Sequence, residues 1–328
     1  MRATSEPRLS LIIPTFNRAG MLAEALDSAL AQTYPHLEII VSDNASTDGT
    51  AELMARYQDP RLRYHRNSDN LGMVGNWRQA IRDLASGDFF LLLSDDDCLL
   101  EPDYLARAAQ LIQDHPDVVV VYGEGWLLDT LTDQRTELRL PFQEVEPGPV
   151  VFASRNTVSP QDFILCNVLF HRRLALELDA FADPLDLCCD SELFLKLCVF
   201  GQVGVLKGRS ALYRLHGGNL IKTIQGNPDL LAHSMNMYLA PHRLALDKGV
   251  LSARQRSAFE STARIALMRS VLVMREHHPD RYRAFVASLR ATAPELMRQL
   301  YRWPRFQRKL LTLRVRLGLK HYWPGSAS

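Results

Sequence analysis

The chain has 328 residues, which exceeds the usual size of one domain and predicts a main domain with an appendage. Apolar residues make up 47% and charged residues 23%, which excludes disordered and collagen-like classes. The formal net charge of +1 excludes a nucleic-acid-binding polycation, and we expect no nucleic-acid partner.

The cysteines and the apolar runs predict a cytoplasmic location. The five cysteines form an odd set without metal-ligand spacing, so we expect them to be reduced. The first residues enter a strand pattern without the basic leader and long apolar region of an export signal. No run of about 18 uncharged apolar residues occurs, so any membrane contact should be peripheral.

The first part of the chain alternates between strand and helix patterns. In chain order, these patterns predict a strand at Leu9 to Pro14, a helix at Met21 to Gln32, a strand at Leu37 to Ser42, a helix at Thr50 to Tyr57, a strand at Arg61 to Arg66, a helix at Val74 to Ala85, a strand at Asp88 to Ser94, a helix at Asp103 to Asp114 and a strand at Val118 to Tyr122. Such alternation predicts an α/β fold with a mostly parallel twisted sheet flanked by helices. Continuous apolar strands are buried on both faces, and ligands bind beyond their carboxyl ends.

The pattern changes further along the chain. Residues from Gly125 to Pro160 are rich in Thr, Pro and charge, which predicts a hairpin or a mobile loop. A helix is expected at Cys189 to Phe200, ending at Gly201. Beyond residue 226 the chain lacks strand runs, and three helices are predicted, at Asp229 to Lys248, Ser252 to His277 and Asp280 to Thr292. We therefore divide the chain into a domain of residues 1–226 and a helical region of residues 227–328.

Three adjacent carboxylates, Asp95, Asp96 and Asp97, directly follow the apolar strand FFLLL. They repel one another at the end of a buried strand, so they need compensation, most simply by a divalent cation. Oxygen ligands favour Mg²⁺ or Mn²⁺, and such ions usually complete their shell with substrate phosphates. The triplet therefore points to a diphosphate substrate. The alternative is a solvated acidic turn.

Two further strand ends carry polar residues at the same predicted edge. Asp43 follows the second strand, where it can accept hydrogen bonds from a base or ribose or can form a turn. Asp48 is expected to be the N-cap of the next helix. The first strand ends with Pro14, Thr15, Asn17 and Arg18. Because loops at this edge carry function in α/β folds, the convergence of three strand ends indicates a binding site.

Six segments carry a family resemblance: LSLIIPTFNR, LEIIVSDNASTDGT, RNSDNLGMVGNW, ASGDFFLLLSDDD, CCDSELFLKL and YRLHGGN. In this order they resemble the motifs of family 2 glycosyltransferases of the GT-A fold, across about residues 9–220. The resemblance implies a nucleotide-sugar-binding half at residues 1–124 and an acceptor and catalytic half at residues 125–226.

The resemblance also implies roles for the residues at the strand ends. Thr15 and Asp43 would contact the nucleoside, and residues 95–97 occupy the metal-binding DXD region. The family often has an acid where this chain has Ser94; Asp97 is our first choice as metal ligand and Asp95 the second. The remaining residues expected to bind the donor are Pro14, Asn17, Arg18, Asn70 and Asp96.

Two later motifs carry the remaining candidates. Asp190 aligns with the catalytic base of similar enzymes, and Cys189 replaces the first acid of the family's usual acidic pair. The alternative for Asp190 is a first-turn carboxylate that interacts with the helix dipole. In similar enzymes a histidine near His216 completes the metal shell or contacts the diphosphate; the alternative is a structural histidine.

Gly72 should provide backbone freedom in the loop after the third strand, and Arg66 is a weaker candidate for sugar or phosphate contact.

Together these features predict an inverting transferase that moves a sugar from a UDP-, dTDP- or GDP-sugar to a glycan or lipid-linked glycan, as in the synthesis of cell-surface polysaccharide or O-antigen. A nucleotidyltransferase is a second hypothesis, although PTFNRAG is a poor match to a Gly-rich phosphate loop. A non-catalytic nucleotide-sugar-binding protein is the third.

Residues 301–323 carry seven Lys or Arg and no acid. Phe306, Leu310, Leu313 and Leu317 share one helical face, a pattern that suits an anionic bilayer surface. We predict peripheral binding at the inner face of the cell membrane. An amphipathic helix packed on the first domain or on another subunit has the same spacing.

Overall fold

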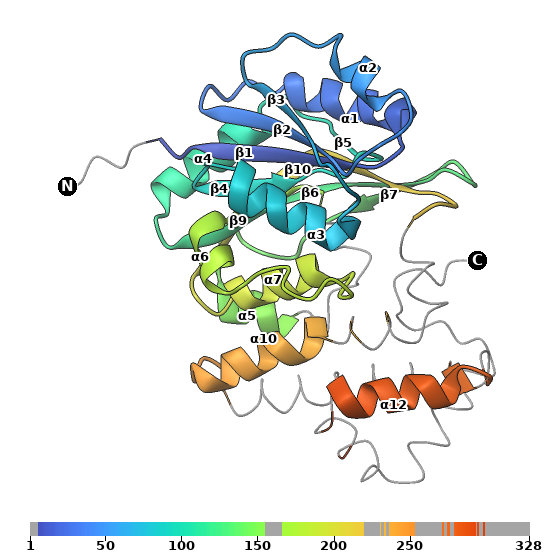
Figure 1. The fold of residues 1–328 in the computed structure, drawn as a ribbon. Helices are drawn as coiled ribbons and strands as arrows, with labels where there is room; N and C mark the ends of the chain where they lie inside the picture. Colours follow the sequence, from blue (N-terminus) through green and yellow to red (C-terminus); the bar gives the residue numbers. More distant parts are fainter. Residues whose placement is uncertain are drawn as a thin grey trace.

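The computed structural model describes residues 6–154 and 166–219 and, beyond them, 236–252, 279–292 and the single positions 230, 233, 271, 274, 275, 294 and 298. The predicted segment 301–323 and most of the helix expected at Ser252 to His277 lie outside these residues. Figure 1 shows a central sheet with helices on both sides and further helices below. The predicted α/β class is confirmed.

Ten strands of the described chain form one sheet, in the order β3-β2-β1-β4-β9-β6-β10-β5, with β7 beside β6 and β8 beside β10. Their bounds are β1 (Leu9–Thr15), β2 (Leu37–Asp43), β3 (Leu62–Arg66), β4 (Phe89–Leu92), β5 (Cys98–Leu99), β6 (Val118–Asp129), β7 (Gln134–Leu138), β8 (Val145–Pro147), β9 (Val168–His171) and β10 (Gln202–Leu215). The first four strands are parallel, as predicted. β9 runs antiparallel to both β4 and β6, and β6 is parallel to β10.

Helices cover both faces of this sheet. Their bounds are α1 (Ala19–Leu30), α2 (Thr50–Met54), α3 (Gly72–Gln79), α4 (Tyr104–Asp114), α5 (Gly148–Ser154), α6 (Arg172–Glu177), α7 (Cys189–Leu197), α10 (Asn236–Asp247) and α12 (Tyr282–Thr292). Successive residues of β1 point to opposite faces: Leu11 and Ile13 pack in the cluster of α1 and α4, and Ile12 packs in the cluster of α3 and α7. Both faces of the parallel strands are therefore buried, as their continuous apolar runs predict.

The segment predicted as one helix, Val74 to Ala85, is an α-helix only in its first half. α3 ends at Gln79, and a π-helical turn, η1 (Ala80–Leu84), follows. The amide of Ala85 donates to the carbonyl of Ala80, five residues earlier, at 2.8 Å. Arg172 donates to the carbonyl of Ile81 at 2.8 Å. This long-range contact satisfies a carbonyl of the wider turn, and the local sequence pattern does not contain it.

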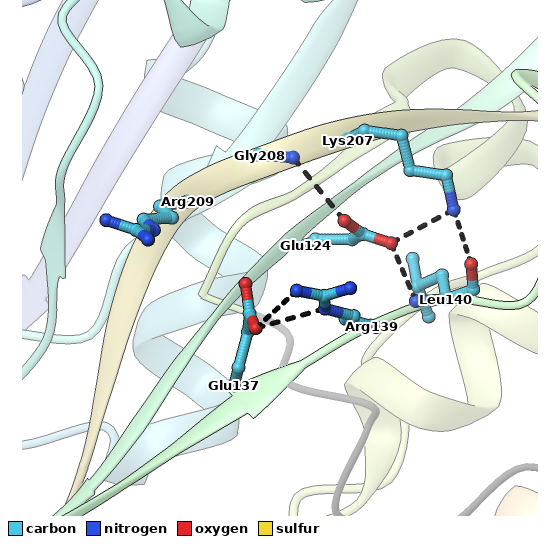
Figure 2. A pocket seen from close by; sticks show the side chains of 7 residues that line it. All are labelled: Glu124, Glu137, Arg139, Leu140, Lys207, Gly208 and Arg209. Atoms are coloured by element: carbon cyan, nitrogen blue, oxygen red, sulfur yellow. Dashed lines mark hydrogen bonds and ion pairs between the residues drawn. The ribbon is translucent and has the colours of Figure 1, made fainter.

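The stretch from Gly125 forms the predicted hairpin, because β6 turns back into β7. At its base, the nearly buried carboxylate of Glu124 accepts hydrogen bonds from the ammonium of Lys207 at 3.0 Å and from the amide of Leu140 at 2.9 Å (Figure 2). Gly208 stands at φ +132°, within a register shift between β10 and β6. Glu124 thus joins the hairpin to the irregular part of β10.

The described C-terminal helices pack on the first domain. α10 lies against α7, and Figure 1 shows both beneath the sheet, on the side away from α1 and α2. Ala245, Phe285 and Leu289 belong to the same buried cluster as Phe194 of α7. Among the described residues, no helix is both long enough and apolar enough to cross a bilayer.

Candidate active site

The ends of β1, β2 and β4 meet at one edge of the sheet. Thr15 and Asp43 are partners in the parallel register of β1 and β2, and Ile12 is the partner of Leu92 at the end of β4. The hydroxyl of Thr15 donates to Oδ2 of Asp95 at 2.7 Å. The structure therefore brings together the strand ends that the sequence analysis placed at a common edge.

Arg18 lies between two members of the acidic triplet. Its Nη1 is 3.1 Å from Oδ1 of Asp95 and 3.0 Å from Oδ2 of Asp96. Its Nη2 donates to the carbonyl of Gly218 at 3.4 Å. One guanidinium from the loop after β1 thus holds together the acidic loop and the loop after β10.

The end of β10 supplies the other partners of the triplet. His216 Nε2 is 2.9 Å from Oδ2 of Asp96, the same oxygen that Arg18 contacts. The amide of Gly218 donates to Nδ1 of His216 at 3.1 Å, so Nε2 is the ring nitrogen that can donate to Asp96. The amide of Arg214 donates to Oδ1 of Asp97 at 2.8 Å.

Burial is the largest influence on the pKa values of Asp95 and Asp97. It raises the pKa of Asp95, against the opposing effects of the Thr15 hydrogen bond and the Arg18 charge. Burial raises the pKa of Asp97 well above its ordinary value, and the adjacent charge of Asp96 adds to this effect. Burial also disfavours the charged form of Arg18, but Asp95 and Asp96 outweigh that effect and raise its pKa. Arg18 is therefore a firmly charged partner for the triplet.

The triplet has the donor atoms that a hard divalent cation prefers. Oδ2 of Asp97 is buried without a hydrogen-bond partner, an unsatisfied oxygen that a cation would complete. Within the described ranges, however, no three His, Cys, Asp or Glu side chains are arranged as ready-made metal ligands. The residue types fit Mg²⁺ or Mn²⁺, but Arg18 occupies the position between Asp95 and Asp96.

Asp43 forms part of a turn at the end of β2. Its carboxylate accepts hydrogen bonds from the amide of Ser46 at 2.8 Å and from the hydroxyl of Tyr64 at 2.6 Å. Arg66 lies 3.8 Å from the same carboxylate and donates to the carbonyl of Ser46 at 2.8 Å. The structure confirms the turn-forming role; contact between Asp43 and a nucleoside stays a prediction.

Three other residues expected to bind the sugar donor have structural roles. Asn17 stands at φ +53°, and its side-chain oxygen accepts from the amide of Thr47 at 2.7 Å. The side-chain oxygen of Asn70 accepts from the amide of Gly72 at 2.8 Å, and Gly72 has the positive φ expected of it, +74°. Pro14 is buried within β1. These residues shape the loops around the site.

Asp48 is not the N-cap of α2, because that position belongs to Gly49. The side chain of Asp48 instead accepts from the amides of Thr50, in the first turn of α2, and of Ala19, at the start of α1, both at 3.0 Å. The carboxylate thus stabilises the N-termini of two helices, which is more than the predicted cap of one.

Asp190 lies in the first turn of α7 and is half-buried. Its carboxylate accepts from the amide of Ser191 at 2.6 Å. Cys189, which stands where the family usually has an acid, is buried in the core. Burial raises the pKa of the Tyr213 hydroxyl on β10, and the charges of Asp97, Asp96 and Asp190 raise it further. Asp190, Asp96 and Asp97 are therefore within electrostatic reach of one side chain.

Sequence reasoning missed two residues near these groups. Asp186 is 1% exposed, accepts from the amide of Cys188 at 3.0 Å, and has its pKa raised to about 9 by burial and by a hydrogen bond with Glu192. Arg214 contacts Asp97 through its amide, and its side chain pairs with Glu24. The motif YRLHGGN contains Arg214, so this residue was available to sequence analysis.

An open pocket of about 430 Å³ lies elsewhere, around Glu124 (Figure 2). None of the sequence-predicted site residues lines it. Its lining is charged: Arg139 pairs with Glu137, and Lys207 pairs with Glu124. We therefore assign it no part in the candidate active site.

Comparison with known proteins identifies the domain that contains these strand ends. Residues 10–152 match the model of the family described as "Glycosyl transferase family 2". The chain carries a glycosyltransferase family 2 domain. The match includes Thr15, Asp43 and the acidic triplet. Asp190 and His216 lie beyond residue 152, so the family match does not extend to them.

Curated relatives of this family 2 domain come from several bacteria. A "PGL/p-HBAD biosynthesis glycosyltransferase" of Mycobacterium bovis is 40% identical over 121 residues, 36% of this chain and 46% of that protein. A "GalNAc(5)-diNAcBac-PP-undecaprenol beta-1,3-glucosyltransferase" of Campylobacter jejuni is 43% identical over 97 residues, 29% of this chain and 31% of that protein. The chain thus spans less than half the length of each.

Solved structures agree on the fold. S. aureus TarS 1–349 in complex with UDP-GlcNAc superposes with a TM-score of 0.60 at 16% identity, over 96% of this chain and 93% of that one. The mannosyltransferase PcManGT from Pyrobaculum calidifontis, in complex with GDP-Man and Mn²⁺, superposes with a TM-score of 0.52 at 17% identity, over 97% and 89%. These likenesses confirm a GT-A-like fold for the family 2 domain.

Proposed function

We propose that this chain is an inverting glycosyltransferase that moves a sugar from a nucleoside diphosphate to a hydroxyl acceptor with the help of a divalent cation. The observation that carries the proposal is the convergence of Thr15, Asp95 and His216 at the carboxyl edge of a family 2 domain. The family match also favours transfer of a sugar over nucleotidyl transfer and over binding alone.

Asp190 is the proposed general base. Its carboxylate would take the proton of the acceptor hydroxyl while the hydroxyl oxygen attacks the anomeric carbon. The bond from that carbon to the diphosphate breaks on the opposite face, so one direct displacement inverts the centre. The support is the position of the half-buried Asp190 in the first turn of α7 and the effect of Asp190, Asp96 and Asp97 on the pKa of the same residue, Tyr213.

The strand ends are the proposed donor site. Thr15 and Asp43 would contact the nucleoside, with the loops of Pro14, Asn17 and Asn70 around them. Mg²⁺ or Mn²⁺, held by Asp97 and Asp95 beside Asp96 and His216, would neutralise the charge that develops on the departing diphosphate. Arg18 adds a guanidinium suited to phosphate oxygens.

The proposed donors are UDP-, dTDP- or GDP-sugars, and the proposed acceptors are glycans or lipid-linked glycans of the bacterial cell surface. The name of the Campylobacter relative includes a lipid-linked glycan, which supports this class.

We also propose the division into a catalytic domain, residues 1–226, and a helical region, residues 227–328, that contacts the inner face of the membrane through residues 301–323. Equal flotation with liposomes of the full chain and a truncation before Tyr301 would contradict the membrane contact.

Calorimetry with a panel of nucleotide sugars, each with Mn²⁺ and with Mg²⁺, tests the donor and the metal together. The proposal expects one nucleoside diphosphate sugar to bind, and to bind more tightly with a cation present than with EDTA. Binding of none of them, or equal binding with EDTA, would contradict the metal-assisted donor site.

A further inference from the structure

We infer that Arg18 occupies the place of the divalent cation on Asp95, beside Asp96, and leaves it when a nucleoside diphosphate binds. This inference rests on the proposed function and concerns the regulation of the same site. It starts from one contact: a single nitrogen, Nη1 of Arg18, bridges an oxygen of Asp95 and an oxygen of Asp96.

The charge of the two aspartates requires a partner. Asp95 is 5% and Asp96 7% exposed, so water compensates them poorly. Arg214, the other guanidinium beside the triplet, directs its side chain to the backbone carbonyl of Asp96 and to the carboxylate of Glu24. Arg18 is therefore the guanidinium that compensates the two side chains in this conformation.

A metal ion and Arg18 compete for the same space. A small divalent cation binds carboxylate oxygens at about 2.1 Å. Nη1 of Arg18 lies 3.1 Å from Oδ1 of Asp95 and 3.0 Å from Oδ2 of Asp96, so a cation held by Asp95 in this space would come close to the guanidinium. Like charges repel at such a distance. The two occupants would therefore exclude each other.

Arg18 is placed to move. Its side chain is 34% exposed, and its third contact, to the carbonyl of Gly218 at 3.4 Å, is long. The residue precedes α1 and has no cap hydrogen bond from its own side chain. A diphosphate offers a guanidinium paired oxygens that match its fork. When the nucleotide binds, Arg18 would therefore leave the aspartates and contact the phosphate oxygens. The cation could then bind to the aspartates.

The exchange predicts that bound nucleotide increases the affinity for the metal ion, and that bound metal ion increases the affinity for the nucleotide. Part of this coupling should come from Arg18. Mn²⁺ is titrated into the full chain, and free Mn²⁺ is followed by its electron paramagnetic resonance signal, with and without saturating UDP, dTDP or GDP. The variant is Arg18→Met, which removes the charge but keeps an extended side chain. The matched control is Arg82→Met, because Arg82 pairs with its neighbour Asp83 on the surface.

Without nucleotide, we expect Arg18→Met to bind Mn²⁺ about tenfold more tightly than the wild type does. The factor by which nucleotide increases the affinity for Mn²⁺ should be about tenfold smaller in the variant. Arg82→Met should match the wild type. Unchanged affinity and unchanged coupling in Arg18→Met would overturn the exchange. Arg18→Gln, an uncharged variant that keeps N–H donors for the carboxylates, gives the same test if Arg18→Met does not fold.

The result is separable from the proposed activity. Altered coupling in a chain that turns over no nucleotide sugar would support the exchange and contradict the transferase. An active transferase with unchanged coupling would contradict the exchange alone.

Discussion

The hydroxyl of Thr15 donates a 2.7 Å hydrogen bond to Asp95, which joins the end of β1 to the acidic loop after β4. Thr15 is 3% exposed, so this bond is shielded from water. It fixes one oxygen of Asp95, and Arg18 contacts the other.

Thr15→Val removes this hydrogen bond but keeps the β-branched shape that suits the end of a strand. Because a hydrogen bond to a charged group contributes about 1.5–3 kcal/mol, we expect nucleoside diphosphate binding with Mn²⁺ to weaken at least about tenfold. Calorimetry measures this loss. Thr33→Val, which removes an exposed hydroxyl bonded to the carbonyl of Pro102, should leave binding unchanged. Equal binding by both variants would show that Thr15 does not position Asp95.

Glu124→Gln tests the junction between the hairpin and β10. The change removes the charge that Lys207 contacts and replaces one acceptor oxygen by an NH₂ donor. We therefore expect the free energy of unfolding to fall by about 2 kcal/mol. Glu137→Gln is the control, because Glu137 pairs with the largely exposed Arg139 and should cost less than about 1 kcal/mol. Urea unfolding compares the two, and equal losses would contradict the role of Glu124.

Asp186→Asn tests the buried acid before α7. Its pKa of about 9, raised by burial and by the hydrogen bond with Glu192 from an ordinary 3.8, means that the folded chain holds a proton that the unfolded chain releases. Between these values the unfolded state binds fewer protons, so wild-type stability falls as pH rises, by up to about 1.4 kcal/mol per pH unit.

Asparagine does not titrate, so the stability of Asp186→Asn should fall less than that of the wild type between pH 5 and pH 8. Urea unfolding at several pH values in this range measures the difference. Asp179→Asn, a change at an exposed acid paired with Arg78, should follow the wild type. Parallel curves for the wild type and Asp186→Asn would show that Asp186 is ionised in the folded chain.

The strand ends could be predicted because local pattern determines them. The apolar run before Asp95 and the run before Asp43 identify buried strands, and the rule that ligands bind beyond the carboxyl ends of such strands locates the edge. Parallel pairing then brings Thr15 beside Asp43, as the register confirms. Composition predicts a hairpin or a mobile loop after Gly125, and the pairing of β6 with β7 shows the hairpin.

Other features depend on partners far apart in the chain. Arg18 contacts Asp95 from 77 positions away in the chain. No local pattern shows that a guanidinium, and not a metal ion, compensates the charge of Asp95 and Asp96. The carbonyl of Ile81 in the π-turn after α3 accepts a hydrogen bond from Arg172, which is 91 positions further along the chain. The raised pKa of Asp186 comes from burial created by the packing of α7. Each of these requires the assembled fold.

One paired measurement on Asp190→Asn tests sugar transfer with Asp190 as the general base. Release of nucleoside diphosphate from the selected donor should fall at least about 100-fold, while the donor's dissociation constant stays within about threefold of the wild type. A wild-type rate in Asp190→Asn would contradict the assignment of the base, and a wild type that binds donors but releases no nucleoside diphosphate would contradict the transferase itself.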